Sequence, residues 1–151
     1  ININIMINFF EICKKIVPHR IIFISSAGAI YPQNENKNFS EYDDTKPYNS
    51  YGNQKLLAEN LFEDFSKRNH IKSTILRVSS AYGFDPRFKD QGVINKWLYS
   101  SIKNQNLKLF NAKESMINFI SFKQISIAIL STLEYELNGI YNIGSCKSIT
   151  L

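Results

Sequence analysis

Two short runs of apolar residues constrain the fold of this chain more than any other feature of its sequence. The runs are Arg20–Ser25, which reads Arg-Ile-Ile-Phe-Ile-Ser, and Ser73–Val78, which reads Ser-Thr-Ile-Leu-Arg-Val. Their apolar residues are consecutive and do not alternate with polar ones, which is typical of strands buried on both faces of a parallel sheet. Parallel strands need a long crossover connection, and that connection is usually a helix.

Helical periodicity is present on both sides of the first run. Apolar residues recur at one-turn spacing from Ile5 to Ile16, where Pro18 prevents the helix from continuing, and a second such pattern covers Tyr51–Phe65. The order helix, strand, helix, strand predicts a doubly wound α/β sheet. Further along the chain we expect helices at Gly92–Ile102 and Ile125–Leu137 and short strands at Leu107–Phe110, Phe119–Ile120 and Ile140–Ile143.

The composition of the 151 residues is that of an ordinary globular domain. Hydrophobic residues make up 44% and charged residues 21%, which excludes collagen-like, disordered and disulfide-scaffold classes. No apolar run approaches the roughly 20 residues that cross a bilayer, so we expect no membrane span. The net charge of +5 comes mainly from scattered lysines and does not indicate a nucleic-acid partner. Cys13 and Cys146 have neither metal-ligand nor disulfide spacing, so we expect no metal site and a reducing, cytoplasmic location.

Ligands of open α/β sheets bind beyond the carboxyl ends of the strands. In this chain those positions are residues 25–31 and 79–83. Two polar segments, Pro32–Pro47 and Gly83–Gln91, predict long surface loops, and long ordered loops often carry function. We therefore expect the site at the strand ends and beneath these loops.

Tyr51 and Lys55 are four positions apart at the start of the second expected helix. Four positions are about one turn, so both side chains lie on one face and reach one ligand. A tyrosine phenol, with a pKa of about 10, is a poor base at neutral pH, but a nearby ammonium stabilises the phenolate. The pair is therefore a candidate for proton exchange with a substrate hydroxyl. The same spacing also occurs in ordinary helices with a solvated lysine, so its meaning depends on its surroundings.

The segments around this pair resemble those of a known family. In chain order they are Phe23–Tyr31, Tyr51–Lys55, Leu76–Gly83, Gln91–Ile94, Asn118–Ser121 and Tyr141–Ser145. In that order they resemble the carboxy-terminal part of extended short-chain dehydrogenases/reductases. The resemblance is specifically to the NAD-dependent epimerase/dehydratase family of nucleotide-sugar enzymes, whose members include UDP-glucose 4-epimerases.

The resemblance implies the second half of a Rossmann-type doubly wound parallel sheet together with a small α/β substrate domain. Residues 1–83 then form part of an NAD-binding domain, and residues 84–151 form mostly the substrate-binding subdomain with returning Rossmann segments. The family's glycine-rich GxxGxxG loop is absent from the sequence, so we expect a carboxy-terminal part that lacks most of the cofactor site. Family members commonly pair through the helices that here begin near Ile5 and Tyr51, which implies a homodimer for the full-length protein.

The resemblance also implies a reaction. The expected cofactor is NAD, with NADP left open, and the expected substrate is a nucleoside-diphosphate sugar. Tyr51 is then the acid/base that takes the proton of the sugar C4 hydroxyl while hydride moves to the cofactor, and Lys55 holds the nicotinamide ribose. The expected activity is 4-epimerisation, with a nucleotide keto-sugar reductase or a dehydratase as the alternative. Gly28 and Ala29 disfavour the dehydratase, because dehydratases usually carry Asp-Glu at this place.

Further site residues are implied by their matching positions in the family. The family's catalytic hydroxyl falls at Ala27, so Ser26 or Ser25 is expected to replace it, and Ser26 is preferred. The expected cofactor contacts are Asn2, Ser25, Tyr51, Lys55 and Ser79, and the expected substrate contacts are Ser26, Ser80, Gly92 and Val93.

The substrate end departs from the family pattern. Ile117 stands where the family has an arginine that grips the diphosphate, and Lys123 stands in place of an aspartate. The loss of a bidentate arginine weakens phosphate recognition, for which Arg87, Lys89 or Lys123 would have to compensate. These departures leave a second hypothesis open, in which the chain is a truncated, non-catalytic remnant or a binding protein.

Overall fold

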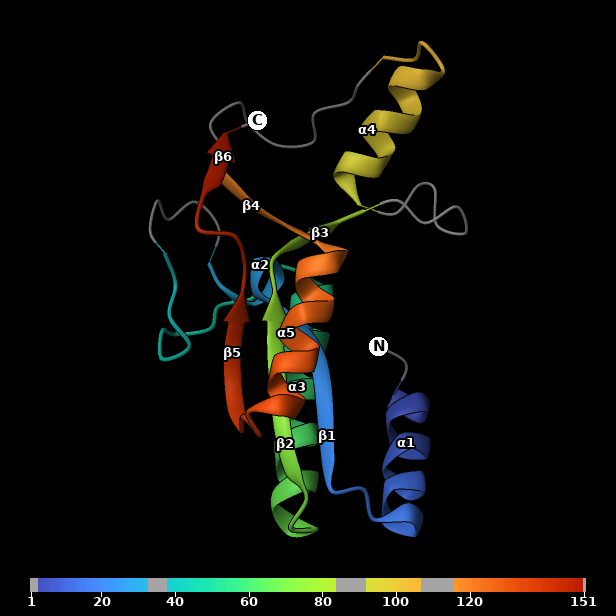
Figure 1. Cartoon of the computed structure of the whole chain (residues 1–151), viewed down its shortest axis with the longest axis vertical. Helices are drawn as coiled ribbons and strands as arrows, with labels where there is room; N and C mark the ends of the chain where they lie inside the picture. The colour runs from blue at the N-terminus through green and yellow to red at the C-terminus, as the bar shows by residue number, and fades with distance from the viewer. Residues whose placement is uncertain (1–2, 33–37, 84–91, 107–115, 151) are drawn as a thin grey trace.

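Three parallel strands form the main sheet of the computed structural model, which describes residues 3–32, 38–83, 92–106 and 116–150. The strands are β1 (Arg20–Ser26), β2 (Lys72–Val78) and β5 (Gly139–Ile143), in the spatial order β1-β2-β5 (Figure 1). Ser25 pairs with Arg77, and Arg77 pairs with Asn142. Because all three strands are parallel, their carboxyl ends meet at one edge of the sheet.

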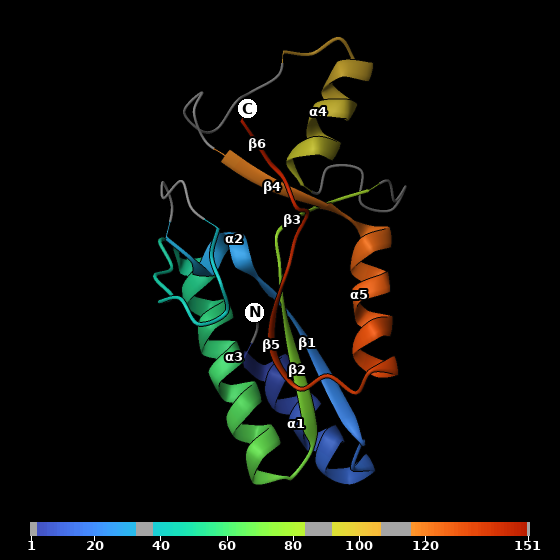
Figure 2. The same cartoon turned by 60° about the vertical axis from the view of Figure 1, so that its left-hand side comes forward.

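Helices cover both faces of this sheet (Figure 2). The three covering helices are α1 (Ile3–Ile16), α3 (Ser50–Arg68) and α5 (Phe122–Glu134). α1 and α3 pack on one face and α5 on the other, where Leu76 and Val78 are buried beneath it. The side chains buried between the sheet and the first two helices are Met6, Cys13, Ile21, Ala58, Phe62, Phe65, Ile71 and Ile75. Both faces of β2 are therefore buried, which explains its uninterrupted apolar sequence.

Polar caps set where two of these helices begin. The Asn49 side chain accepts a hydrogen bond from the Gly52 N–H at 2.8 Å and so caps α3. At α5, the Ser121 side chain accepts from the Gln124 N–H while the Gln124 side chain accepts from the Ser121 N–H, which is a capping box. α5 therefore begins at Phe122, three residues before the start that apolar periodicity predicts.

A second, smaller sheet lies beyond the carboxyl edge of the main sheet (Figure 1). Its strands are β3 (Ser80–Tyr82), β4 (Met116–Ser121) and β6 (Ser148–Thr150), in the order β3-β4-β6. β3 runs parallel to β4, and β6 runs antiparallel to it. α4 (Val93–Ile102) packs beside β3. The chain thus leaves the main sheet after β2 and returns to it as β5.

The fold class predicted from the sequence is confirmed, because a parallel sheet with helices on both faces is joined to a small second α/β unit. The predicted strands at residues 20–25 and 73–78 are each one residue longer in the structure. The helix predicted at Tyr51–Phe65 begins at Ser50 and continues to Arg68. The strand expected at Leu107–Phe110, and residues 84–91 of the second expected loop, lie outside the described residues.

Three short elements are present that periodicity does not predict. They are β3, β6 and α2 (Ala27–Ile30), which follows β1 directly. Elements of three or four residues cover about one helical turn at most, which is too short to show a helical repeat, and carry too few alternations to mark a strand. They form here because they contact other segments of the same chain; β3 and β6, for example, both pair with β4.

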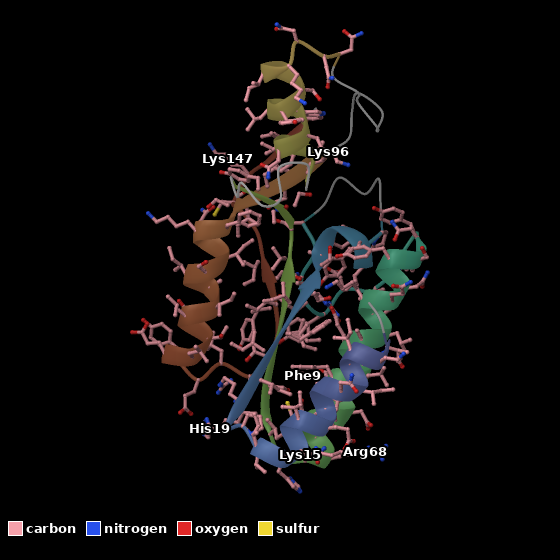
Figure 3. The ribbon with its side chains drawn as sticks, turned by 90° about the vertical axis from the view of Figure 1, so that its right-hand side faces the viewer. Phe9, Lys15, His19, Arg68, Lys96 and Lys147 are labelled. Carbon is pink, nitrogen blue, oxygen red and sulfur yellow. The ribbon has the colours of Figure 1, made fainter. Side chains whose placement is uncertain are left out.

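Among the residues that the structure describes, no helix is long and apolar enough to span a membrane. The same residues contain no group of three or more His, Cys, Asp and Glu side chains placed to bind a metal ion. His19 lies at the amino end of β1, remote from the second sheet, where Lys96 and Lys147 lie (Figure 3).

Candidate functional site

Tyr51 and Lys55 lie in the first two turns of α3, at the end of the helix beside α2 and the carboxyl edge of the main sheet (Figure 2). The Lys55 ammonium nitrogen is 5.9 Å from the centroid of the Tyr51 ring. The Tyr51 side chain is 50% exposed, whereas Lys55 is half-buried. The structure therefore brings the two together on one face of the helix and leaves the phenol accessible to a ligand.

Lys55 also contacts the main sheet. Its ammonium donates a hydrogen bond of 2.8 Å to the main-chain carbonyl oxygen of Ile24 and lies 5.1 Å from the centroid of the Phe23 ring. Burial lowers the pKa of Lys55 below its ordinary value, and the negative charge of Glu59 partly opposes that effect. An ammonium has three N–H donors, so the bond to Ile24 leaves two for a ligand.

Gly52 sets how closely the start of α3 approaches α2. A Cβ atom at this position would lie 2.1 Å from the carbonyl oxygen of Ala29 and 2.9 Å from the Cβ of Pro47. Both distances are far below van der Waals contact, so only glycine fits without a shift of the backbone. The close approach places Tyr51, the preceding residue, next to the segment that follows β1.

Two serine hydroxyls at the carboxyl edge are buried and have no hydrogen-bond partner. They belong to Ser25, which is 4% exposed near the end of β1, and to Ser79, which directly follows β2. Ser79 is held in place through its main chain, whose N–H donates to the carbonyl oxygen of Ile143 at 2.9 Å. A buried hydroxyl without a partner is costly, so each of these two groups needs a bonding partner, which a bound water or a ligand would supply.

The remaining serines predicted for the site are near these two. Ser26 ends β1, is half-buried and precedes α2 without capping it through its side chain. Alternation along the strand directs Ser26 to the face opposite Ser25. Ser80 is the first residue of β3 and pairs with Phe119 of β4. All four serines therefore lie where the main sheet meets the second one.

Gly92 and Val93 lie on the side of the second sheet. Gly92 has a φ of +82° and immediately precedes α4, of which Val93 is the first residue. The Asn95 side chain donates to the carbonyl oxygen of Gly83 at 2.8 Å and ties this turn of α4 to the end of β3. Asn2, predicted to contact the cofactor, lies outside the described residues.

A buried polar network beneath the site is not predicted from the sequence. Arg77 of β2 forms an ion pair with Glu59 of α3, with Nη2 2.8 Å from Oε2, and donates a bond of 2.8 Å to the Tyr31 hydroxyl. Burial acts to lower the pKa of Arg77, but the bonds to Glu59 and Tyr31 outweigh it and hold that pKa above its ordinary value. Two signals were available: an arginine within an otherwise apolar strand, and Glu59 one turn after Lys55.

The network continues to β5 and to the loop that follows α2. The Tyr31 hydroxyl lies 3.0 Å from the side-chain oxygen of Asn142, and the Tyr31 ring stacks on Phe39 with centroids 4.8 Å apart. The Asn142 side chain donates to the carbonyl oxygen of Phe39 at 3.0 Å, and its main-chain N–H donates to Glu41 at 2.6 Å. The described part of the loop is therefore fastened to the carboxyl end of the sheet.

At the substrate end, Asn118 of β4 holds the turn after β5. Its side chain donates to the carbonyl oxygen of Ser145 at 2.7 Å and accepts from the Ser145 N–H at 2.8 Å. The neighbouring Ile117, which stands in place of the family's arginine, pairs with Ile149 of β6. Lys123 is exposed near the start of α5. Of the basic residues named as replacements for that arginine, Arg87 and Lys89 lie outside the described residues.

Comparison with known proteins gives a family match over nearly the whole chain. The family described as the NAD dependent epimerase/dehydratase family matches residues 1–144. Among curated proteins, dTDP-4-dehydro-6-deoxyglucose reductase of Escherichia coli is 34% identical, over 99% of this chain and 48% of its own length. A putative UDP-glucose 4-epimerase of Methanocaldococcus jannaschii is 29% identical, over 100% of this chain and 50% of its own length. The chain thus spans about half the length of these relatives.

Solved structures show the same fold. The UDP-N-acetylglucosamine 4-epimerase of Methanobrevibacter ruminantium, in complex with UDP-N-acetylmuramic acid, superposes with a TM-score of 0.86 at 27% identity, over 99% of this chain and 48% of that one. The Thermus thermophilus UDP-glucose 4-epimerase, in complex with NAD, superposes with a TM-score of 0.83 at 23% identity, over 95% of this chain and 48% of that one. The architecture of the main sheet, its helices and the second sheet is therefore that of known sugar-nucleotide epimerases.

Proposed function

The chain belongs to the NAD-dependent epimerase/dehydratase family, and on that premise we propose that it carries the proton-transfer residues of a nucleotide-sugar 4-epimerase. The observation that supports this most directly is the placement of Tyr51 and Lys55 at the carboxyl edge of a parallel sheet, beside buried serine hydroxyls that lack partners. This is the position at which open α/β sheets bind ligands.

The residues at this edge fit the nicotinamide end of NAD. The unpartnered hydroxyls of Ser25 and Ser79 offer hydrogen bonds to a polar ligand, and Lys55 retains two N–H donors. We propose that these residues, with Tyr51 and Asn2, contact the cofactor. The bound cofactor supplies the hydride acceptor, chemistry that no side chain provides. The fit is the same for NADP, because this end is common to both dinucleotides.

In this proposal Tyr51 moves the proton. Its phenolate oxygen accepts the proton of the sugar C4 hydroxyl as the hydrogen on C4 leaves as hydride, so that C4 becomes a ketone. The nearby Lys55 ammonium would stabilise the phenolate, and the Ser26 hydroxyl would bond the oxygen on C4. If the keto-sugar then turned its other face to the cofactor, return of the hydride to that face and of the proton by Tyr51 would give the epimer. Proton transfer of this kind contributes about 10² to 10⁴ in rate.

We propose a nucleoside-diphosphate sugar as the substrate, bound between the carboxyl edge and the second sheet. The M. ruminantium and T. thermophilus proteins are epimerases of UDP sugars by name, and they superpose on 99% and 95% of this chain, respectively. Ser80, Gly92 and Val93 are the proposed substrate contacts on the side of the second sheet. Residues 1–83 and 84–151 would then act mainly as cofactor and substrate portions, respectively.

A nucleotide keto-sugar reductase is the second candidate. It is favoured by the E. coli reductase, which is 34% identical across 99% of this chain. Tyr51 and Lys55 suit that reaction equally well, because Tyr51 would give a proton to the ketone oxygen. Reduced cofactor would supply the hydride and be consumed. Isomerisation consumes no net cofactor, so the two candidates differ in stoichiometry.

Activity assays on the full-length protein separate these candidates. The protein is incubated with UDP-glucose or UDP-N-acetylglucosamine for epimerisation, and with a dTDP-4-keto-6-deoxy sugar plus NADH or NADPH for reduction. Tyr51→Phe should lower turnover by about 10² or more, because it removes the acid/base. Tyr48→Phe is the matched control, since Tyr48 is 49% exposed and Tyr51 is 50% exposed. Full activity in Tyr51→Phe would rule out the proposed role of this residue.

We further propose that the full-length protein is a homodimer that forms through α1 and α3. The outer side of α1 carries exposed apolar side chains, including Ile5 at 67% and Ile16 at 67% exposure, which are costly to leave in water. Analytical ultracentrifugation tests this, and substitution of both isoleucines by Glu should shift the protein to a monomer.

A cytoplasmic location is proposed from Cys13 and Cys146, both of which are free thiols.

A further inference from the structure

One row of polar residues crosses all three strands of the main sheet just below its carboxyl edge. Ser25 of β1 pairs with Arg77 of β2, which pairs with Asn142 of β5. Arg77 and Asn142 are linked through the Tyr31 hydroxyl, and the hydroxyl of Ser25 is free of partners. Polar side chains in a buried sheet are expensive unless bonded, so a complete row of them is not explained by packing alone.

Glu59 connects this row to the helix that carries the candidate site. Its carboxylate receives three bonds from Arg77, from Nε to both carboxylate oxygens at 3.2 Å and from Nη2 at 2.8 Å. The two side chains are only 3% and 5% exposed. A planar guanidinium that bonds a carboxylate in this way fixes both position and orientation, which a single contact would not do.

Tyr51, Lys55 and Glu59 follow one another at intervals of four residues along α3. At that spacing they form one row along the helix, each about one turn from the next. Rotation or sliding of α3 that moved Glu59 away from Arg77 would therefore move Lys55 away from the Ile24 carbonyl and Tyr51 away from its place at the carboxyl edge.

We propose that Glu59 and Arg77 are positioning residues for Tyr51 and Lys55. The buried pair fixes the rotation of α3 and its height along the sheet, so that Lys55 stays on the carbonyl oxygen of Ile24 and the phenol stays at the carboxyl edge. The proposal that the pair fixes the position of α3 rests on the structure alone, whereas the importance of that position for turnover rests on the proposed function.

Stability by itself is a weak reason for such a pair. Burying two charges costs desolvation free energy that their attraction does not fully return, and a well-packed apolar pair often serves a fold equally well. The alignment of Lys55 and Tyr51 with Glu59 along α3 gives another reason for the pair. The Arg77 guanidinium accepts the Glu59 carboxylate in one orientation, which suits a helix whose side chains must meet a ligand.

The test measures the Lys55 bond to Ile24 directly, by the NMR carbonyl ¹³C shift of Ile24. Lys55→Met removes that bond and gives the reference shift for its loss. The double variant Glu59→Gln with Arg77→Met removes both charges, so no unpaired buried charge remains to unfold the protein. We expect the Ile24 shift in this variant to move more than halfway to the Lys55→Met value. Arg77→Lys, which keeps the charge and loses the fork, should move it in the same direction.

A matched control lies one turn further along the helix. Glu63→Gln makes the same chemical change at a pair that is not buried, in which the 35% exposed Glu63 side chain lies 3.5 Å from Lys67, and should leave the Ile24 shift at the wild-type value. The positioning role would be overturned if the Ile24 shift stayed at the wild-type value in the double variant or in the Arg77→Lys variant while that variant was folded. Movement of the shift by Glu63→Gln would overturn it too, since any helix charge would then suffice.

Turnover of the full-length protein provides the second readout. In the double variant kcat should fall about 10²-fold while KM for the nucleotide sugar stays near the wild-type value, because a displaced acid/base reacts poorly with substrate that still binds. If the pair is merely structural, kcat of the double variant should return once its melting temperature is restored. If the wild-type protein has no activity, the proposed function fails, and the Ile24 shift still decides whether the pair positions the helix.

Discussion

The ammonium nitrogen of Lys55 lies 2.8 Å from the main-chain carbonyl oxygen of Ile24, so the helix that carries the candidate acid/base is tied to β1 at the residue before Ser25. One side chain thereby touches the strand, the Phe23 ring and the neighbourhood of the Tyr51 phenol. The lysine of this pair is in that sense a structural tie as well as a candidate ligand for the cofactor.

The pH dependence of stability should report the burial of Lys55. Burial lowers the pKa of Lys55 in the folded protein below its unfolded value. At pH values between the two, the folded state therefore binds fewer protons than the unfolded state. The free energy of unfolding contributed by Lys55 therefore rises with pH from the lowered pKa up to the unfolded value of about 10.4. Urea denaturation of wild type and Lys55→Met at a series of pH values measures the difference. A difference that stays flat with pH would contradict the prediction.

Gly52→Ala should destabilise the fold, since its Cβ would meet the backbone carbonyl of Ala29 at 2.1 Å. Overpacking of this kind costs about 1–3 kcal/mol. Gly28→Ala in α2 is the matched control, because nothing lies within 4 Å of a Cβ built there. Urea titration of both variants checks the contrast, and equal stabilities would show that α2 and α3 separate at little cost.

Glu59→Gln should lower the free energy of unfolding by about 3–5 kcal/mol, because it leaves the Arg77 charge buried without its partner. Asp64→Asn on the same helix removes an exposed pair, in which Arg68 lies 2.8 Å away, and should cost less than about 1 kcal/mol. Chemical denaturation of the two variants in parallel distinguishes them. A small effect in Glu59→Gln would mean that water reaches Arg77.

Ser25→Ala should leave the stability of the ligand-free protein unchanged or slightly increased, because the hydroxyl that it removes is buried without a partner. Ser121→Ala, which removes a helix cap, should instead cost about 1 kcal/mol. In the full-length protein Ser25→Ala should weaken NAD binding about tenfold, as measured by calorimetry. Unchanged affinity would remove Ser25 from the proposed cofactor contacts.

The parts of the fold that follow from local pattern could be predicted. Consecutive apolar residues at 21–24 mark β1, and one-turn spacing marks α1 and α3. The pairing of Tyr51 with Lys55 follows from the same spacing and is confirmed by the 5.9 Å contact. The roles of Ser26, Ser79, Gly92 and the other proposed contacts stay predictions, because their function requires a ligand.

The parts that depend on distant residues could not be predicted. Arg77 and Glu59 are 18 positions apart and meet only because α3 packs across β2. Glu41 and Asn142 are 101 positions apart, and no local pattern relates them. Capping likewise overrides periodicity at Ser121, so α5 includes polar residues that an apolar pattern omits.

The bond between Glu41 and Asn142 blocks one edge of the main sheet against the addition of another strand. β5 is at one edge of the sheet, and the Asn142 N–H that points away from β2 is already bonded to a carboxylate at 2.6 Å. A new strand on that side would have to displace a charged acceptor and the Phe39 segment stacked on Tyr31. Exposed strand edges invite aggregation unless they are blocked in such a way. Any further strand, from this protein or another, would therefore join the sheet beside β1.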